Sequence, residues 1–239
     1  MSDLVGQSAS VVIRKLAENI CGGSVLHFFS PAPVPPLGVR LKPYPDLHQF
    51  LRLVHSLRTK IGMEFWESAS LLRFRAGAST DSLLSAACFH NSTSIRSWQV
   101  KVEDLSEVCL YEMERESLQD SSLSVRSSVT HDDYATSHIP MLDFACPAEQ
   151  ENLVLVTKII RRLEVGGGFV LGSGRSYHFY GSRLLSLEEL PCFLGRALLF
   201  GSVVDRRWIA HQLVRGYCSL RVSRRKDTEV SPTIESVLD

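Results

Sequence analysis

Four side chains in the C-terminal half of the sequence are of the types that metal and phosphate chemistry requires. Asp143 stands in the segment HIPMLDF, Ser176 and His178 in GSGRSYHFYG, and Asp205 in FGSVVDRRW. Carboxylate oxygens are the ligands that Mg²⁺ prefers, and hydroxyl and imidazole groups form hydrogen bonds with phosphate oxygens. Two carboxylates beside such donors suit a divalent metal and a triphosphate. If the segments converge, the pattern fits nucleotide chemistry.

Basic residues follow the same segments. They form two groups along the chain, Arg206 and Arg207 after the second aspartate, and Arg221, Arg224, Arg225 and Lys226 at the end of a strand-like run. Guanidinium groups bind phosphate with paired hydrogen bonds, whereas most runs of charge in proteins are solvated faces. The sequence leaves both interpretations open.

These residues are expected to meet because each lies in or beside a predicted strand. Periodicity predicts a strand at 138–144, a helix at 148–164, strands at 169–173 and 176–180, helices at 186–200 and 205–215, and a strand at 218–222. Gly174 and Arg175 separate two closely spaced strands, which indicates a hairpin. The order favours an α+β fold in which helices pack on one face of a sheet.

The N-terminal portion, residues 1–116, is expected to be mixed α/β. Apolar residues at helical spacing predict helices at 10–21 and 44–61, and strand-like runs occur at 70–76 and 97–102. A proline-rich stretch separates the two helices and is expected to be extended.

The three motifs resemble those of the archaeo-eukaryotic primase superfamily of primase-polymerases. That family has a strand with two alternating aspartates, then a Ser-x-His strand, then an apolar residue followed by aspartate, and a later basic position. This chain offers Met141-Leu142-Asp143, Ser176-Tyr177-His178 and Val204-Asp205, with Arg221 and Lys226 as candidates for the basic position. The resemblance covers about residues 133–226 and implies a primase-polymerase-like fold with an RRM-like C-terminal sheet packed by helices.

The resemblance also implies roles for individual residues. Asp143 and Asp205 would be catalytic and would bind Mg²⁺ or Mn²⁺. The residues that would contact the nucleoside triphosphate are Ser176, His178, Arg175, Arg221 and Lys226. Those that would contact single-stranded nucleic acid or a primer-template are Arg206, Arg207, Arg224 and Arg225. The implied activity is nucleotidyl transfer in the synthesis of DNA or RNA primers.

The first motif departs from the family pattern, because Met141 stands where the first aspartate is expected. A thioether is a poor ligand for Mg²⁺, so one hard oxygen ligand is missing unless Asp132 or Asp133 supplies it. Two-metal phosphoryl transfer needs carboxylates that hold both ions. The alternative function is therefore a catalytically inactive, primase-like subunit that binds or senses a nucleotide or nucleic acid within a larger assembly.

Structural roles compete with these functional ones. Asp143 and Asp205 each precede a predicted helix and are good candidates for N-caps. His178 lies in a strand, where a single histidine is more often structural than functional. A third hypothesis is a structural scaffold that binds neither nucleotide nor nucleic acid.

Composition places further limits on the chain. Its 239 residues carry 26 basic and 26 acidic side chains, but the charge is segregated, with 13 basic against 4 acidic residues in 156–226 and 3 against 12 in 100–155. A basic groove is thus compatible with zero net charge.

We divide the chain into residues 1–116, a serine-rich acidic loop at 117–133, a motif module at 134–226 and a polar, frayed tail at 227–239. The loop is a candidate to occupy the groove.

Other site types are disfavoured by the sequence. It contains neither a P-loop nor a Rossmann fingerprint, and its cysteines form no CxxC pair. No stretch has the length or apolar character of a membrane span, and no signal peptide is recognised at the start. A cytoplasmic protein without membrane partners is expected.

Overall fold

A computed structural model describes residues 4–35, 39, 46–61, 65–76, 81–90, 93–119, 121–225 and 230–239. The chain divides into two compact units. Residues 1–32 and 92–239 form the first unit, and residues 33–91 form the second. The second unit is thus inserted in the chain between the first two strands of the first.

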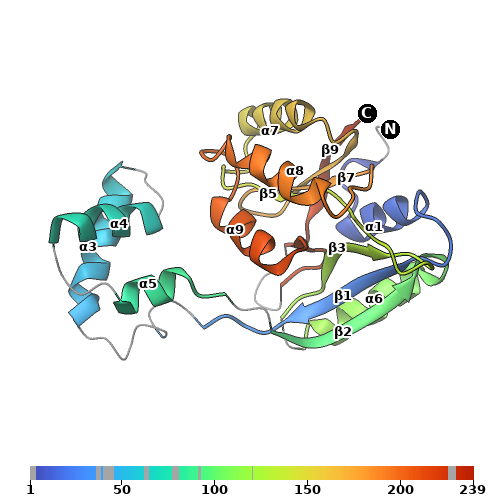
Figure 1. The fold of residues 1–239 in the computed structure, drawn as a ribbon, viewed down its shortest axis with the longest axis horizontal. Coiled ribbons are helices and arrows are strands. Elements are labelled where there is room, and N and C mark those ends of the chain that lie inside the picture. Colours follow the sequence, from blue (N-terminus) through green and yellow to red (C-terminus); the bar gives the residue numbers. More distant parts are fainter. Residues whose placement is uncertain are drawn as a thin grey trace. The chain divides into compact units, whose positions relative to one another are not determined.

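The first unit contains two antiparallel sheets (Figure 1). The strands of the five-stranded sheet are β1 (Val25–Pro31), β2 (Ser94–Lys101), β3 (Ser124–Thr130), β4 (Thr136–His138) and β8 (Ser219–Arg221). Their order is β2-β1-β3-β4, and β8 pairs with β3 beside β4. The strands of the four-stranded sheet are β5 (Met141–Asp143), β6 (Gly168–Gly172), β7 (Tyr177–Gly181) and β9 (Thr233–Leu238), in the order β5-β7-β6-β9.

Helices of the first unit pack against these sheets around one core. They are α1 (Ala9–Ala17), the 3₁₀ turn η2 (Val102–Asp104), α6 (Glu107–Ser117), α7 (Gln150–Leu163), α8 (Glu189–Leu198) and α9 (Arg206–Arg215). In α7 the residues at helical spacing, Leu153, Val156 and Ile160, are buried, which explains why this segment forms an amphipathic helix. A single cluster of buried apolar side chains includes residues of both sheets and these helices. The predicted α+β class is confirmed.

The second unit is helical in the part that the structure describes. It contains α3 (Asp46–Ile61), α4 (Phe65–Ala76) and α5 (Asp81–Ala87), with a small core that includes Leu47, Val54 and Ala69. The helix predicted at 44–61 is confirmed over 46–61, and its first two residues lie outside the described part of the chain. The strand predicted at 70–76 is wrong, because this segment continues α4, whose Ala69 and Leu72 belong to the apolar cluster shared with α3.

The prediction of a loop at 117–133 is also wrong. Its residues 124–130 form β3, which pairs with β1, β4 and β8 and so lies inside the five-stranded sheet. Val125 and Val129 are buried, and the Ser127 hydroxyl accepts a hydrogen bond from the backbone N–H of Cys218 at 2.9 Å. Serines fit this buried strand because their hydroxyls find partners there. Because β3 is hydrogen-bonded along both of its edges, this segment is not a loop that could occupy the groove and be displaced by a ligand.

Two further predictions are corrected by the sheet topology. The single strand predicted at 138–144 is two strands, β4 and β5, which lie in different sheets. The frayed tail predicted at 227–239 contains β9, whose Ile234 and Leu238 are buried against the edge of β6. The strand predicted at 218–222 is present as β8 but joins the five-stranded sheet. Among the described residues, no helix is long and apolar enough to cross a membrane.

Candidate functional site

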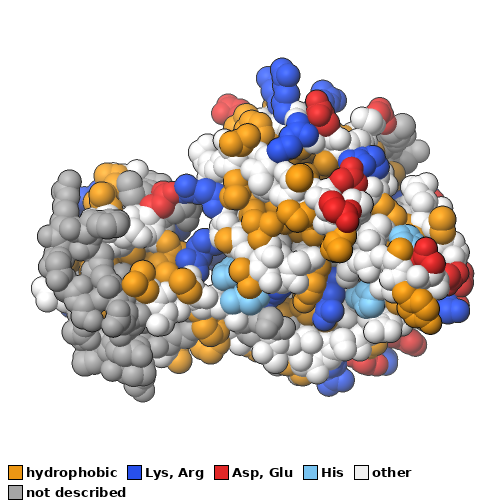
Figure 2. All heavy atoms as spheres, in the orientation of Figure 1, with side chains coloured by type: hydrophobic (Ala, Val, Ile, Leu, Met, Phe, Trp, Pro, Cys, Tyr) orange, Lys and Arg blue, Asp and Glu red, His pale blue; other side chains and the backbone are white. Residues whose placement is uncertain are grey.

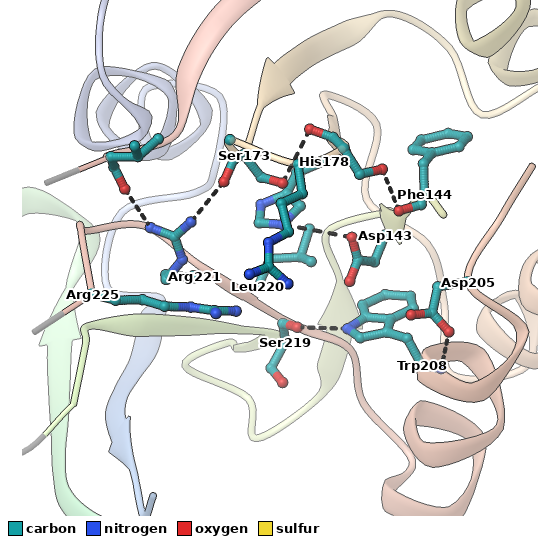
Figure 3. A pocket seen from close by; sticks show the side chains of 14 residues that line it. Asp143, Phe144, Ser173, His178, Asp205, Trp208, Ser219, Leu220, Arg221 and Arg225 are labelled. Carbon is teal, nitrogen blue, oxygen red and sulfur yellow. Dashed lines mark hydrogen bonds and ion pairs between the residues drawn. The ribbon is translucent and has the colours of Figure 1, made fainter. Parts of the chain in front are cut away.

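A cavity of about 530 Å³ lies where the two sheets and α9 meet. Its wall includes the end of β5, the turn between β6 and β7, the start of α9 and the strand β8. The residues that line it are Asp143, Phe144, Ser173, Gly174, Arg175, Ser176, His178, Asp205, Trp208, Ser219, Leu220, Arg221, Arg225 and Val230. In Figure 3, Arg221 and Arg225 lie on one side of this cavity and Asp143 and Asp205 on the other.

The two carboxylates are brought together by backbone pairing. The N–H of Asp205 donates to the carbonyl of Asp143 at 2.9 Å, and Phe144 forms a bridge with Val204. Asp205 also caps α9, because its Oδ1 accepts a hydrogen bond from the N–H of Trp208 at 2.8 Å. The capping role expected for Asp205 is therefore confirmed, alongside its place in the cavity.

Asp143 has no such capping role. Helix α7 begins at Gln150 with Glu149 as its N-cap residue, so Asp143 does not start the helix that follows it. Burial and the nearby negative charge of Asp205 raise the pKa of Asp143 to about 8, although Arg225 and Arg221 partly oppose this shift. The Asp143 side chain remains 26% exposed. With this pKa, Asp143 is largely protonated at pH 7, and a bound cation would favour its ionised form.

His178 lies directly opposite Asp143 in the pairing of β5 with β7. Its Nε2 is 3.6 Å from Asp143 Oδ1, and its buried Nδ1 has no hydrogen-bond partner among the described residues. Burial, together with the charges of Arg221 and Arg225, lowers the pKa of His178 to about 3. The imidazole is therefore neutral at pH 7 and presents one donor and one acceptor rather than a charge.

The predicted hairpin between β6 and β7 is confirmed and forms one wall of the cavity. Gly174 has φ +102°, a conformation that suits glycine in this turn. The Ser176 hydroxyl donates to the carbonyl of Phe144 and so joins the turn to the end of β5. Arg175, the next predicted phosphate contact, also lines the cavity.

Arg221 holds three chain segments together at the opposite wall. Its guanidinium donates to the carbonyl of Ser173 at 2.9 Å, to that of Val230 at 3.0 Å, and to that of Ser223. Arg221 thus fixes the β6–β7 turn relative to β8 and to the segment that leads into β9. Arg225 is exposed, lines the same cavity, and makes no hydrogen bond to the described residues through its guanidinium.

The other predicted basic contacts lie apart from the cavity wall. Arg224 is close to Glu114 of α6, where its charge and backbone N–H oppose the burial that raises the pKa of Glu114. Arg206 and Arg207 begin α9 but do not line the cavity. Lys226 lies outside the described residues.

The position of the missing aspartate is occupied by apolar packing. Met141 is fully buried and faces Tyr180 across the strand pair. Asp133 Oδ1 accepts a hydrogen bond from the N–H of Ala135 in the β3–β4 turn, and Asp132 lies against Gly23, so neither lines the cavity. Neither residue is therefore placed to supply the third carboxylate that the sequence left open.

The donor set fits a single hard cation. Within the described part of the chain, no group of three or more histidine, cysteine or acidic side chains is placed to hold a metal ion. Mg²⁺ is commonly bound by one or two carboxylates together with substrate phosphates and water. Asp143 and Asp205 satisfy that requirement only when phosphate oxygens complete the coordination.

Sequence reasoning missed several side chains of the cavity, among them Trp208 and Ser219. Trp208, expected in the core, lines the cavity and donates from Nε1 to the carbonyl of Ser219 at 3.1 Å. Its position three residues after an N-cap aspartate is a signal that places it beside Asp205. Ser219 had no such signal, because its place depends on the pairing of β8 with β3.

The family of the chain follows from comparison with known proteins. No curated protein and no solved structure matches the chain. A family model described as AEP-like, archaeo-eukaryotic primase 1D-like, matches residues 101–233. The matched region is more than half of the 239 residues and includes both aspartates and the Ser-x-His strand of the cavity. The chain therefore belongs to the archaeo-eukaryotic primase family.

Proposed function

We propose that the chain binds a nucleoside triphosphate, with one divalent cation, in the cavity between the two sheets. The observation that carries this proposal is that Asp143 and Asp205 line the same cavity as Arg221 and Arg225. Carboxylates on one wall and guanidiniums on the other suit a polyphosphate that carries a cation.

Each side chain has a distinct part in this binding. Arg225 offers donors that no described residue uses, so it is the group best suited to bind a phosphate oxygen. Arg221 already donates to three carbonyls, and it contributes positive charge and holds the β6–β7 turn in place. Neutral His178 offers a hydrogen bond without competing for the cation.

The cation would be held by Asp143 and Asp205. Bound Mg²⁺ would neutralise charge on the phosphates and on the carboxylate pair. We expect the two aspartates to retain one ion, since the buried side chain of Met141 supplies no oxygen ligand.

Calorimetric titration with a non-hydrolysable nucleoside triphosphate analogue tests this proposal. We expect binding that needs Mg²⁺ or Mn²⁺ and that weakens about tenfold or more in Asp143→Asn and in Arg225→Gln. Arg161→Gln is the matched control, because it removes one exposed arginine from the end of α7. Unchanged affinity in both cavity variants, or the same loss in the control, refutes the proposal.

Nucleotidyl transfer is the second candidate function, and it is favoured by the retention of both aspartates at the cavity. Two-metal transfer requires carboxylates that hold both ions, so we expect no primer synthesis by the wild-type chain. The assay uses labelled nucleotides, a single-stranded template and Mg²⁺ or Mn²⁺. A product that disappears in Asp143→Ala would establish transfer and contradict the expectation of binding alone.

A further inference from the structure

The outer edge of β2 is an open edge of the five-stranded sheet. Among the described strands, β2 ends the order β2-β1-β3-β4 and pairs only with β1. It is eight residues long, and Figure 1 shows it at the margin of the first unit. The outer edge of a strand presents backbone N–H and C=O groups that can pair with a further strand. This edge is therefore a candidate interface.

Three residues of β2 direct their backbone groups away from β1. Just beyond the strand pair, the N–H of Val102 donates to the carbonyl of Ser24 at 2.9 Å. Hydrogen-bonded and non-hydrogen-bonded positions alternate along an antiparallel pair. In the register of β1 with β2, the backbone groups of Ser97, Gln99 and Lys101 therefore point outward.

The regular part of this edge is the C-terminal half of β2. Ser30 pairs with Arg96 but Pro31 pairs with Ser94, so Ile95 is an extra residue on the β2 side. Such a bulge interrupts the ladder and bends the strand. An incoming strand is thus expected to pair with residues 97–101 and not with the bulged end.

Two apolar side chains of β2 lie at the rim of the core beside this edge. Trp98 pairs with Phe28 and Val100 pairs with Leu26, so both side chains face the same side of the sheet as the core. Each packs against the main apolar cluster but is only partly buried. A strand placed along β2 would cover both, and burial of partly exposed aromatic groups is typical of protein interfaces.

The sequence of this edge is complementary to itself. A second copy placed antiparallel, about a two-fold axis perpendicular to the sheet at Gln99, puts Gln99 opposite its own counterpart. Ser97 then lies opposite Lys101 of the second copy, and Trp98 lies opposite Val100 of the second copy. All three outward-facing residues form hydrogen-bonded pairs, and the apolar residues meet at the closer, non-hydrogen-bonded positions. No like charges face each other in this register.

Net charge does not oppose the association of two copies. The chain carries 26 basic and 26 acidic residues. Figure 2 shows side chains of both signs along the lower edge of the first unit, where β2 lies in Figure 1. A formal net charge near zero removes the long-range repulsion that keeps strongly charged proteins apart.

We propose that two copies of this chain pair through β2, with the two-fold axis at Gln99, and so join their five-stranded sheets into one. The inference is independent of the proposed function, because no residue of β2 lines the nucleotide cavity. An extended peptide of another protein is the other possible occupant of the edge, and it would leave the chain monomeric on its own.

Sedimentation velocity from about 1 to 100 µM tests the proposal, since an interface of this size is expected to be reversible. We expect a monomer–dimer equilibrium in the wild type. Gln99→Lys and Gln99→Glu should each weaken dimerisation about tenfold, because either one places two like charges opposite each other at the axis. Ser97→Glu should strengthen it about threefold by facing Lys101. Gln150→Lys, at an exposed position at the start of α7, is the matched control.

Cysteine cross-linking tests the register. Gln99→Cys places two thiols on a hydrogen-bonded pair, whose Cα atoms are about 5.5 Å apart and within the range of a disulfide. Ser97→Cys places them on residues that do not face each other. Mild oxidation should therefore produce a covalent dimer of Gln99→Cys. Ser97→Cys should stay at the wild-type background, which is set by exposed Cys21, Cys88 and Cys192.

Several results would overturn this inference. They are a monomer over the whole concentration range, a dimer whose affinity is the same in Gln99→Lys as in Gln150→Lys, and a covalent dimer formed through Ser97→Cys. Circular dichroism and thermal melting establish that each variant is folded, and Gln99→Glu decides if Gln99→Lys is not. Nucleotide-analogue binding should be unchanged in Gln99→Lys. A dimer with this register in a protein that binds no nucleotide supports the inference and refutes only the nucleotide proposal.

Discussion

The two roles of Asp205 can be separated by substitution. Its Oδ1 accepts a hydrogen bond from the N–H of Trp208 at the start of α9, and its charge acts on Asp143, which lies on the same side of the cavity. Asparagine keeps a capping oxygen but removes the charge, whereas alanine removes both. We therefore expect Asp205→Asn to lose the cation site and keep the helix cap, and Asp205→Ala to lose both.

The magnitudes follow from the local structure. Loss of an N-cap costs about 1 kcal/mol, so Asp205→Ala should lower the melting temperature by about 2–4 °C for a chain of this size. The free energy of unfolding of Asp205→Asn should stay within about 0.5 kcal/mol of wild type. Asparagine interacts less favourably with the helix dipole, but the variant also removes the unfavourable effect of the Asp205 charge on Asp143. Both variants should weaken the affinity for Mn²⁺ in the presence of nucleotide analogue by about 100-fold or more.

Urea denaturation and calorimetric titration of Mn²⁺ measure these two effects independently. Ser106→Ala is the matched control, because Ser106 caps α6 by accepting from the N–H of Cys109 at 3.1 Å and lies outside the cavity. It should lose about 1 kcal/mol of stability with unchanged cation affinity. The account of Asp205 is wrong if the asparagine variant is as unstable as the alanine variant, or if it binds the cation normally.

Three further predictions concern buried residues of the first unit. Met141→Asp should destabilise the fold by about 3 kcal/mol or more in urea denaturation, since it places an unpaired carboxyl at a fully buried position, while Met141→Leu should cost less than about 1.5 kcal/mol. Equal stability of the two variants would show that position 141 is accessible to solvent or cation. Ile234→Ala in β9 should lower the free energy of unfolding by about 2–5 kcal/mol, whereas Glu235→Ala, at an exposed position of the same strand, should lower it by about 0.5 kcal/mol or less. Similar losses in both variants would mean that β9 is not part of the folded core. Burial lowers the pKa of His138, so the unfolded chain binds more protons and stability should fall as the pH drops below about 6.5. His138→Gln should reduce this acid dependence in pH-dependent denaturation, and an unchanged slope in the variant would refute the assignment.

Much of the C-terminal half was predictable because its segments carry strong local signals. The apolar face of α7 and the glycine turn between β6 and β7 identify a helix and a hairpin before any tertiary contact is known. Asp143, His178 and Asp205 fall at strand ends or at a helix start, which placed them near one another in the prediction.

The errors arose where pairing between distant segments decides the structure. Serine-rich β3 has few large apolar residues, and it is a strand because β1, β4 and β8 satisfy its backbone. The same is true of β9, which looks like a polar tail until β6 is placed beside it. The stacking of Arg126 on the rings of Phe29 and Tyr217 also had no local signal, because the three residues come from separate segments of the chain.

The most direct test of the central claim is a crystal structure with Mn²⁺ and a non-hydrolysable nucleoside triphosphate analogue. The account predicts one anomalous scattering peak between the carboxylates of Asp143 and Asp205, with the triphosphate in the cavity against Arg225. A nucleotide bound elsewhere, or an ion held without these two aspartates, would contradict the claim. Two ions at the cavity would contradict the single-cation account and favour nucleotidyl transfer.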